Sequence, residues 1–259
     1  SRGEKLPLFT SCCPGWVKFA EQHYSEFLPN LSTCKSPQQM FGAVAKEILP
    51  EQLNVKKENL VVVSIMPCTA KKSEAARPEF AEGNIKEVDI VLTTQELASM
   101  IKQAGIRFEN LTPESLDLPM GFKTGAGVIF GNSGGVSEAV LRYAYEKVNE
   151  VKLDSFEFTE ARGEDSIREL EVNLNGTRVR LAIVSGLKNA KNLLEKINKK
   201  EAEYDIIEVM ACPGGCIGGA GQPYIFEANA KEERTKGLYD SDKTLQLHKS
   251  QENPYIASL

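Results

Sequence analysis

Hydrophobic positions along the chain repeat with two different periods, and the helical period dominates several stretches. Apolar side chains recur at helical spacing over residues 14–27, which predicts an amphipathic helix. A second helix is predicted to begin at Ser36-Pro37, because serine caps helices and proline suits the first helical position; it should end near Pro50. Further helices are expected over residues 93–103, where Thr93 and Glu96 form a capping box, over about 136–148, and over 187–197.

Short runs of β-branched residues predict strands between these helices. The runs are residues 60–65, 88–92 and 204–209, and we expect buried strands at the first and third. Alternating residues on both sides of Asn175-Gly176 are typical of a β-hairpin. The alternation of strands and helices predicts an α/β fold with mixed or parallel sheets flanked by helices. A glycine-rich stretch over 124–135 suggests two lobes, residues 1–130 and 131–259.

Composition narrows the classes of partner. The chain has 259 residues, 41% of them hydrophobic, and a net charge of −5, which disfavours nucleic acid or an anionic membrane as the main partner. No apolar run approaches the roughly 20 residues that span a bilayer, and the N-terminus lacks the apolar stretch of a signal peptide. We therefore expect a cytoplasmic protein, with the periplasm reachable through a partner subunit. Its six cysteines should be thiols or metal ligands rather than disulfides.

Five of the six cysteines lie in three short peptides, each with a proline beside a cysteine. The peptides are residues 10–16, 66–74 and 208–223. Cys68 and Cys212 each follow a predicted strand, where α/β sheets usually place ligands. Soft thiolates select iron–sulfur clusters, zinc or Cu(I). Zinc is less favoured, because paired C-x-x-C motifs are absent and the chain has only two histidines. A fold with reduced thiols and no metal is the remaining alternative.

These peptides resemble the three signatures in the catalytic domain of the iron-only ([FeFe]) hydrogenase large subunit. The family pattern reads TSCCPxW, then MPCxxKxxE, then ExMxCxxGCxxGGGQP, and the three peptides follow it in that order. Ala220 replaces the middle glycine of the third signature, and Gln251 stands where the family often has histidine. The resemblance implies a catalytic domain that reversibly reduces protons to dihydrogen, with its metal cluster in the cleft between two lobes. It also implies that an upstream part of the domain and accessory iron–sulfur domains are absent from this chain.

The resemblance further implies a cofactor and a role for each matching residue. A [4Fe–4S] cluster would be held by Cys13, Cys68, Cys212 and Cys216. Cys216 would also bridge to a diiron subcluster with CO, cyanide and a bridging dithiolate, which completes the H-cluster. Cys12 would carry protons, with Ser32 next in the relay. The residues that would line the cluster are Met66, Pro67, Lys71, Met210, Ser36, Gln38, Phe130 and Gly131.

Two other functions share these signatures. One is a hydrogen-sensing or regulatory paralogue that binds the same cluster, and the presence of Cys12 favours catalysis over it. The other is a relative that serves iron–sulfur cluster assembly, against which the complete first signature argues. The implied partners are an electron donor or acceptor such as ferredoxin or other iron–sulfur subunits, maturation proteins, and whatever polypeptide supplies the missing catalytic segments. No ligand role is implied for Cys34, which we expect to be a core or near-site thiol.

Overall fold

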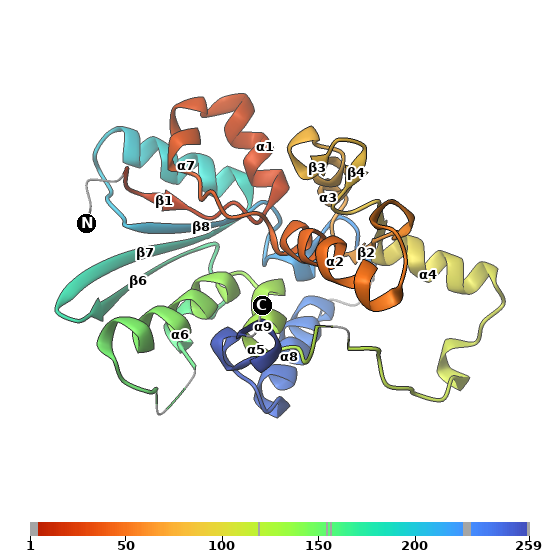
Figure 1. The fold of residues 1–259 in the computed structure, drawn as a ribbon. Coiled ribbons are helices and arrows are strands. Elements are labelled where there is room, and N and C mark those ends of the chain that lie inside the picture. Colours follow the sequence, from red (N-terminus) through yellow and green to blue (C-terminus); the bar gives the residue numbers. More distant parts are fainter. Residues whose placement is uncertain (1–4, 119, 154, 156, 225–228, 258–259) are drawn as a thin grey trace. The chain divides into compact units, whose positions relative to one another are not determined.

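The structure is a computed structural model that describes residues 5–118, 120–153, 155, 157–224 and 229–257 (Figure 1). The strands are β1 (Leu8–Phe9), β2 (Val63–Met66), β3 (Ala81–Glu82), β4 (Ile85–Lys86), β5 (Ile90–Thr93), β6 (Ile167–Leu174), β7 (Thr177–Ser185) and β8 (Ile206–Met210). The α-helices are α1 (Pro14–His23), α2 (Pro37–Leu53), α3 (Ala70–Ala75), α4 (Thr94–Gln103), α5 (Gly125–Val128), α6 (Gly135–Asn149), α7 (Leu187–Asn198), α8 (Ala230–Thr244) and α9 (Pro254–Ala257). Short 3₁₀ helices are η1 (Ser25–Asn30), η2 (Lys57–Asn59), η3 (Pro78–Phe80), η4 (Phe108–Asn110), η5 (Ile129–Gly131), η6 (Thr159–Ala161), η7 (Cys216–Gly218) and η8 (Ser250–Glu252).

The chain folds into two units, and each is assembled from separate stretches of sequence. Unit 1 comprises Ser1–Ser32, Met120–Gly218 and Glu227–Leu259, and unit 2 comprises Thr33–Pro119 and Gly219–Phe226. This division differs from the expected lobes 1–130 and 131–259, because unit 1 is interrupted after Ser32 and the late segment Gly219–Phe226 belongs to unit 2. Cys12 and Cys13 therefore share a unit with Cys212 and Cys216, whereas Cys68 belongs to unit 2.

A mixed four-stranded sheet organises unit 1, with the strand order β1-β8-β7-β6. β1 and β7 both run parallel to β8, and β6 runs antiparallel to β7. The β6–β7 turn is made by Asn175 and Gly176, whose φ angles are 49° and 81°. These left-handed conformations are the ones a tight two-residue hairpin requires, so the predicted hairpin is confirmed.

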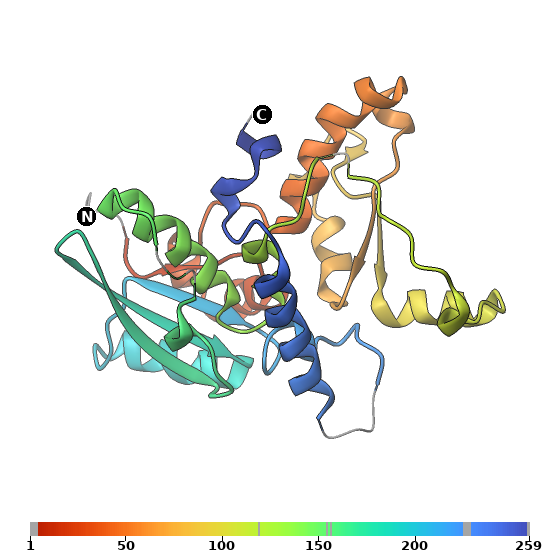
Figure 2. The same cartoon turned by 90° about the horizontal axis from the view of Figure 1, so that it is seen from below.

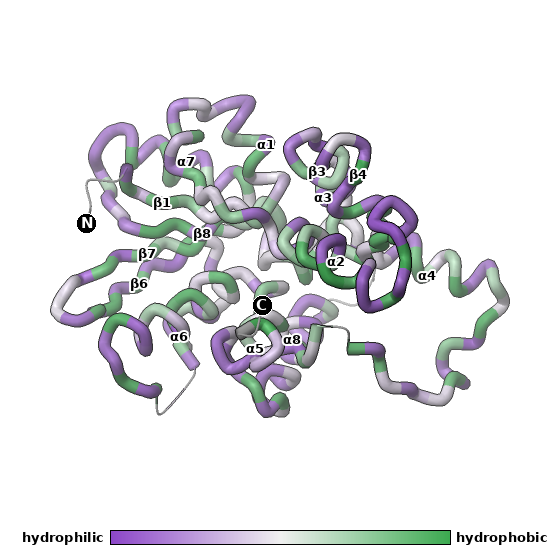
Figure 3. Tube along the Cα trace, in the orientation of Figure 1, coloured by the Kyte–Doolittle hydropathy of each residue, from purple (hydrophilic) through white to green (hydrophobic). Residues whose placement is uncertain are grey.

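Helices α1 and α7 pack against one face of this sheet (Figure 1). Their buried side chains include Trp16 and Leu194, which join Ile207 and Val209 of β8 in one apolar core. The Trp16 ring lies 5.4 Å from the ring of Phe9 on β1. Each large side chain buried in this way contributes roughly 1.5–3 kcal/mol. Figure 3 shows β8 as a hydrophobic strand, as expected for an inner strand of the sheet.

The opposite face of the sheet is covered by α6, and α8 runs beside α5 (Figure 2). Buried charges join these helices. The Arg142 guanidinium on α6 donates hydrogen bonds of 3.0 and 2.6 Å to the two carboxylate oxygens of Asp242 on α8, and one of 2.8 Å to the His248 carbonyl. Planar arginine–carboxylate pairs of this kind fix both distance and orientation. They attach residues 230–248 firmly to the rest of unit 1.

Unit 2 contains a parallel pair of strands, β2 and β5, and a small β3–β4 hairpin. Its buried core is small and includes Ala75 of α3, Val88 and Val91. The opposite side of the β2–β5 pair carries Val63 and Ile65, which are 47% and 50% exposed. The prediction that residues 60–65 form a buried strand is thus wrong for this face, because within unit 2 the helices cover only the other face.

The α/β fold class is confirmed, and most predicted elements are present with shifted ends. The first helix stops at His23, and a 3₁₀ helix that contains Pro29 follows it. The second passes through Pro50 and ends before Asn54, whose left-handed φ of 52° terminates it. The predicted capping box of Thr93 and Glu96 is present at the start of α4. Within the described ranges, no helix is both long and apolar enough to cross a membrane.

Candidate functional site

The loops that carry four of the cysteines leave the same edge of the unit 1 sheet. β1 and β8 are parallel, with Phe9 opposite Ile207, so the residues that follow the two strands emerge together. Cys12 and Cys13 come shortly after β1, and Cys212 comes two residues after β8. The parallel pairing therefore brings together cysteines that stand at opposite ends of the sequence.

Cys13 lies directly against the end of β8. Its sulfur accepts a hydrogen bond of 3.3 Å from the backbone N–H of Ala211. Gly15 permits this approach, because a Cβ at that position would come within 2.9 Å of the Ala211 Cβ. Cys13 is also the residue that precedes α1, and the N-terminus of a helix favours negative charge. The position thus suits a thiolate ligand of an anionic cluster.

The loop from Cys212 to Cys216 is built around two glycines. Gly214 and Gly215 have φ angles of 81° and 93°, which residues other than glycine rarely adopt. The Gly215 N–H donates to the Cys212 carbonyl at 3.1 Å, and the 3₁₀ turn η7 begins at Cys216. The two cysteines are therefore held at the ends of one tight turn.

A second loop packs against this turn and carries predicted site residues. The Ser133 N–H donates to the Gly214 carbonyl at 3.1 Å, and Asn132 forms an isolated bridge with Gly215. Phe130 and Gly131 lie immediately before, in η5. Met210, at the end of β8, is only 3% exposed. Unit 1 thus gathers these three predicted neighbours around its cysteine turn.

Ser32 is attached to the end of β1. Its backbone N–H donates a hydrogen bond of 2.8 Å to the carbonyl of Phe9, three residues before Cys12. The two residues to which the resemblance gives a proton-transfer role therefore belong to adjoining segments of unit 1.

The cysteines of the three signatures offer sulfur as their donor atom. None of the six cysteines is in a disulfide; Cys34 is exposed, so it is not a core thiol, and the other five are partly exposed. Within the described ranges, no group of three His, Cys, Asp or Glu residues could hold a single metal ion. A cubane takes one thiolate at each iron corner, so its ligands stand farther apart than the four thiolates that meet one Zn²⁺ through bonds of about 2.3 Å. Thiolate donors without carboxylates or histidines suit iron–sulfur chemistry.

Unit 2 gathers several predicted residues around one carboxylate, that of Glu74. The Lys71 ammonium lies 2.9 and 3.0 Å from its two oxygens, and both side chains are largely buried. The Ser36 hydroxyl donates to the same carboxylate, and the Gln38 amide lies 3.4 Å from it. Gln38 is held in turn by the Ser64 hydroxyl, at 2.8 Å. Ser36, Gln38 and Lys71 therefore form one hydrogen-bonded group.

The end of β2 is covered by the returning segment of unit 2. The Gly221 N–H donates to the Pro67 carbonyl at 3.0 Å. A Cβ on Gly221 would lie 2.7 Å from the Cys68 backbone nitrogen, so only glycine allows this approach. Met66, the last residue of β2, is partly buried against the unit 2 core. Pro67 and Cys68 are thus fixed by the last residues of the third signature.

Two carboxylates that the sequence analysis treated only as signature letters prove to be organising residues. Glu74 holds Lys71, and Glu208 accepts two backbone hydrogen bonds in the interior of unit 1. The sequence itself contains a signal for Glu208, because it is a charged residue inside an apolar strand. Such a residue needs hydrogen-bond or ionic partners when it is buried.

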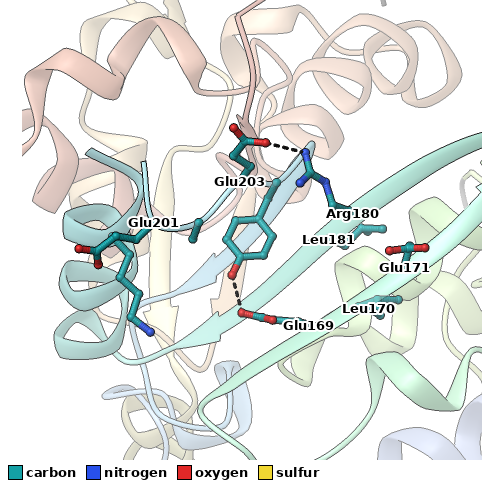
Figure 4. A pocket seen from close by; sticks show the side chains of 10 residues that line it. Glu169, Leu170, Glu171, Arg180, Leu181, Glu201 and Glu203 are labelled. Carbon is teal, nitrogen blue, oxygen red and sulfur yellow. Dashed lines mark hydrogen bonds and ion pairs between the residues drawn. The ribbon is translucent and has the colours of Figure 1, made fainter. Parts of the chain in front are cut away.

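A pocket of about 440 Å³ in unit 1 lies at the other end of β8 (Figure 4). Tyr204, which precedes β8, donates its hydroxyl hydrogen to Glu169 there. Burial, followed by the Glu169 contact, raises the Tyr204 pKa above its ordinary value. The Arg180 guanidinium pairs with Glu203 at 3.3 Å. The lining residues include no predicted site residue, so this pocket is separate from the cysteine loops.

Comparison with known proteins identifies the family. The model described as iron only hydrogenase large subunit, C-terminal domain, matches residues 1–220, and the model of the iron hydrogenase small subunit matches residues 228–259. A subunit of an NADP-reducing hydrogenase from Solidesulfovibrio fructosivorans is 48% identical over 98% of this chain and 44% of its own length. The periplasmic [Fe] hydrogenase large subunit of Nitratidesulfovibrio vulgaris is 50% identical over 90% of this chain and 56% of its own length.

The solved structures and the more distant relatives agree with this grouping. An apo [FeFe]-hydrogenase from Chlamydomonas reinhardtii superimposes with a TM-score of 0.84 at 39% identity, over 98% of this chain and 71% of that chain. A cytosolic Fe–S cluster assembly factor from Xenopus tropicalis is 34% identical over 99% of this chain and 55% of its own length. The chain spans about half the length of these curated relatives. With matching signatures, fold and relatives, this chain belongs to the family formed by the C-terminal domains of iron-only hydrogenase large subunits.

Proposed function

We propose that this chain is the catalytic domain of an iron-only hydrogenase and supports the reversible conversion of two protons and two electrons into dihydrogen. The observation that carries the proposal is the parallel β1–β8 pairing, which delivers the first and third cysteine signatures to one edge of a sheet. Identities of 48% and 50% to hydrogenase subunits support the same function.

Under this proposal Cys13, Cys68, Cys212 and Cys216 would hold a [4Fe–4S] cluster, whose irons take thiolate ligands. Cys216 would also hold the diiron subcluster with its CO, cyanide and dithiolate ligands. When bound, this H-cluster supplies the redox chemistry and the open metal site of the reaction. The polypeptide supplies thiolates, excludes water with apolar side chains such as the buried Met210, and moves protons.

In unit 2, we propose that Lys71 presents its positive charge to an anionic cyanide ligand. A buried ammonium needs a counter-charge, and Glu74 provides it at 2.9 Å. Ser36 and Gln38 hold Glu74 in place. Met66 and Pro67 would complete the lining beside Cys68.

The proposed proton carrier is the thiol of Cys12. An unperturbed thiol has a pKa of about 8.5, so it can give up and regain a proton near neutral pH. Ser32, whose N–H is bonded to Phe9 at the end of β1, is the proposed next member of the relay. Cys12 and Ser32 belong to the same unit as Cys212 and Cys216.

Two observations bear on the partners. Residues 228–259 match the small-subunit model and are part of unit 1, so we propose that they serve here as the equivalent of a small subunit. The chain covers about half of its hydrogenase relatives, so we propose that further polypeptide carries the electrons from ferredoxin or other iron–sulfur subunits. Maturation proteins would load the cluster.

Service in cluster assembly is the second candidate, because cluster assembly factors are 34% identical over almost the whole chain. The higher identity of the hydrogenases favours catalysis. A hydrogen-sensing role would use the same cluster with low turnover.

Infrared spectroscopy with a paired cysteine substitution tests the proposal. The chain is produced with hydrogenase maturation proteins under anaerobic conditions, and metal-bound CO and cyanide stretches are expected. Cys12→Ala should retain iron and these bands but lose most hydrogen evolution with a chemical reductant. Cys34→Ala, at an exposed thiol, is the matched control and should keep full activity. Absence of the bands with plain iron–sulfur absorption would support assembly, bands with slow turnover would support sensing, and loss of iron in Cys12→Ala would reverse the assignment of relay and ligand.

A further inference from the structure

Glu208 is a carboxylate inside an otherwise apolar strand. Its side chain is fully buried, and it projects from β8 on the face opposite to Ile207 and Val209, which belong to the core with α1 and α7. Burial raises the pKa of its carboxyl, although the backbone N–H groups of Gly134 and Ser137 act in the opposite direction. A buried carboxylate costs free energy unless it is fully hydrogen-bonded, so its partners show what it holds.

Both oxygens of Glu208 bind the start of α6. Oε1 accepts a hydrogen bond of 2.7 Å from the Gly134 N–H, and Oε2 accepts one of 2.7 Å from the Ser137 N–H. Gly134 precedes α6, has a φ of 95°, and offers no side chain to cap the helix. The carboxylate from β8 takes over that capping, at the helix end that favours negative charge.

Arg168 approaches the same segment from β6. The register places Arg168 opposite Ile183 and Ile183 opposite Glu208, so the two charged residues lie in one row on one face of the sheet. The Arg168 guanidinium donates to the Ser133 carbonyl at 2.8 Å and to its hydroxyl at 3.2 Å. It also donates to the Gly163 carbonyl at 2.9 Å. Two side chains of opposite charge thus hold adjacent residues: Arg168 binds Ser133, and Glu208 binds Gly134.

This held segment supports the cysteine turn. The Ser133 N–H donates to the Gly214 carbonyl at 3.1 Å, midway between Cys212 and Cys216. The backbones are so close that a Cβ on Gly215 would lie 2.5 Å from the Ser133 nitrogen. Glu208 also belongs to the strand that leads into Cys212. The turn is therefore constrained directly through β8 and indirectly through Ser133 and Gly134.

We propose that Glu208 and Arg168 are positioning residues that fix the turn between Cys212 and Cys216. Their hydrogen bonds fix the backbone of Ser133 and Gly134, which we call the support. The turn between Cys212 and Cys216 packs against this support. That the positioned sulfurs are cluster ligands rests on the proposed function, whereas the support itself does not.

Thiol labelling of the metal-free chain tests the proposal without any need for a cluster. Mass spectrometry follows the alkylation rate of each cysteine under native conditions in Glu208→Gln and in Arg168→Met. Glutamine leaves one backbone N–H without an acceptor, and methionine removes the donors to Ser133. Labelling of Cys212 and Cys216 should accelerate by about ten-fold or more, the factor expected from losing a buried hydrogen bond, while Cys13 and Cys34 keep their rates.

Asp242→Asn is the matched control, because it also neutralises a fully buried carboxylate of unit 1, one paired with Arg142 rather than with the support. It should leave the Cys212 and Cys216 rates unchanged. Equal acceleration at Cys13, or the same acceleration in Asp242→Asn, would mean general loosening and would overturn the proposal, as would unchanged rates in both test variants. If Glu208→Gln does not fold, Arg168→Met alone decides by the same criteria.

A spectroscopic measurement separates this inference from the proposed function. After cluster reconstitution, the electron paramagnetic resonance g-values of the reduced [4Fe–4S] cluster should change in Glu208→Gln and stay constant in Asp242→Asn. Unchanged g-values in Glu208→Gln would contradict the positioning role. A chain that takes up no cubane but shows the expected labelling pattern would retain the support and lose the proposed function.

Discussion

The two parallel strand pairs of this chain place cysteines in the same way but differ in how fully they are covered. In unit 1, β8 lies between β1 and β7 and has helices on both faces. In unit 2, β2 and β5 form a pair with one half-exposed apolar face. The comparison teaches that the end of a strand is enough to present a cysteine, whereas a parallel sheet gains stability from cover on both faces.

The largest expected effect comes from one substitution made in both units. Ile207→Ala removes a fully buried side chain and should cost unit 1 about 2–5 kcal/mol. Ile65→Ala, at a half-exposed site, should cost unit 2 about 1 kcal/mol or less. Trp16, the only tryptophan, reports on unit 1 by fluorescence during urea unfolding, and hydrogen exchange of β2 and β5 reports on unit 2. Equal costs at the two positions would break the comparison.

A smaller effect is expected where unit 2 closes over its cysteine. Gly221→Ala puts a Cβ within 2.7 Å of the Cys68 nitrogen and 2.9 Å of the Pro67 carbonyl carbon. Backbone atoms cannot rotate away, so unit 2 should lose about 1–3 kcal/mol, seen as faster hydrogen exchange in β2. In Gly237→Ala on α8, no neighbouring atom of the described part of the chain lies within 4 Å of the added carbon, so the variant should be neutral or slightly stabilising. Unchanged exchange in Gly221→Ala would argue against the packing of this segment on Cys68.

The smallest effect concerns acid and the start of α4. The hydrogen bond from Lys72, followed by the bonds from Thr93, lowers the pKa of Glu96 from 4.5 to about 2. Because the folded pKa lies below the unfolded one, the stabilisation is present above pH 4.5 and is lost as the pH falls towards about 2. In the parent chain, the protection of α4 against hydrogen exchange should therefore fall as the pH is lowered from 4.5 towards about 2. In Glu96→Gln this protection should change much less over the same pH range. Glu58→Gln, at an exposed glutamate of the same unit, serves as the control and should behave like the parent chain.

Local signals predicted the elements whose ends are defined by chemistry close in sequence. The Asn175-Gly176 turn and the Thr93–Glu96 capping box both appear in the structure as expected. Ser36 likewise caps α2. These features depend on residues within one turn of each other, so a single sequence contains all the information they need.

Features that depend on distant residues escaped the sequence analysis. β1 is a strand of two residues, too short for any periodicity, and exists because β8 lies beside it. The exposure of Ile65 follows from what covers the strand rather than from its β-branched composition. The role of Glu208 depends on Gly134, which is remote in sequence. The cluster ligands themselves remain predictions that rest on the family signatures.

The pairing of Leu8 with Ile206 has a consequence for folding during synthesis on the ribosome. β1 leaves the ribosome well before its partner strand β8 is synthesised, because β8 follows much later in the sequence. Until then the first cysteine pair has no neighbouring strand to hold it. The Cys13 sulfur can therefore accept its hydrogen bond from the Ala211 N–H only after β8 has been synthesised.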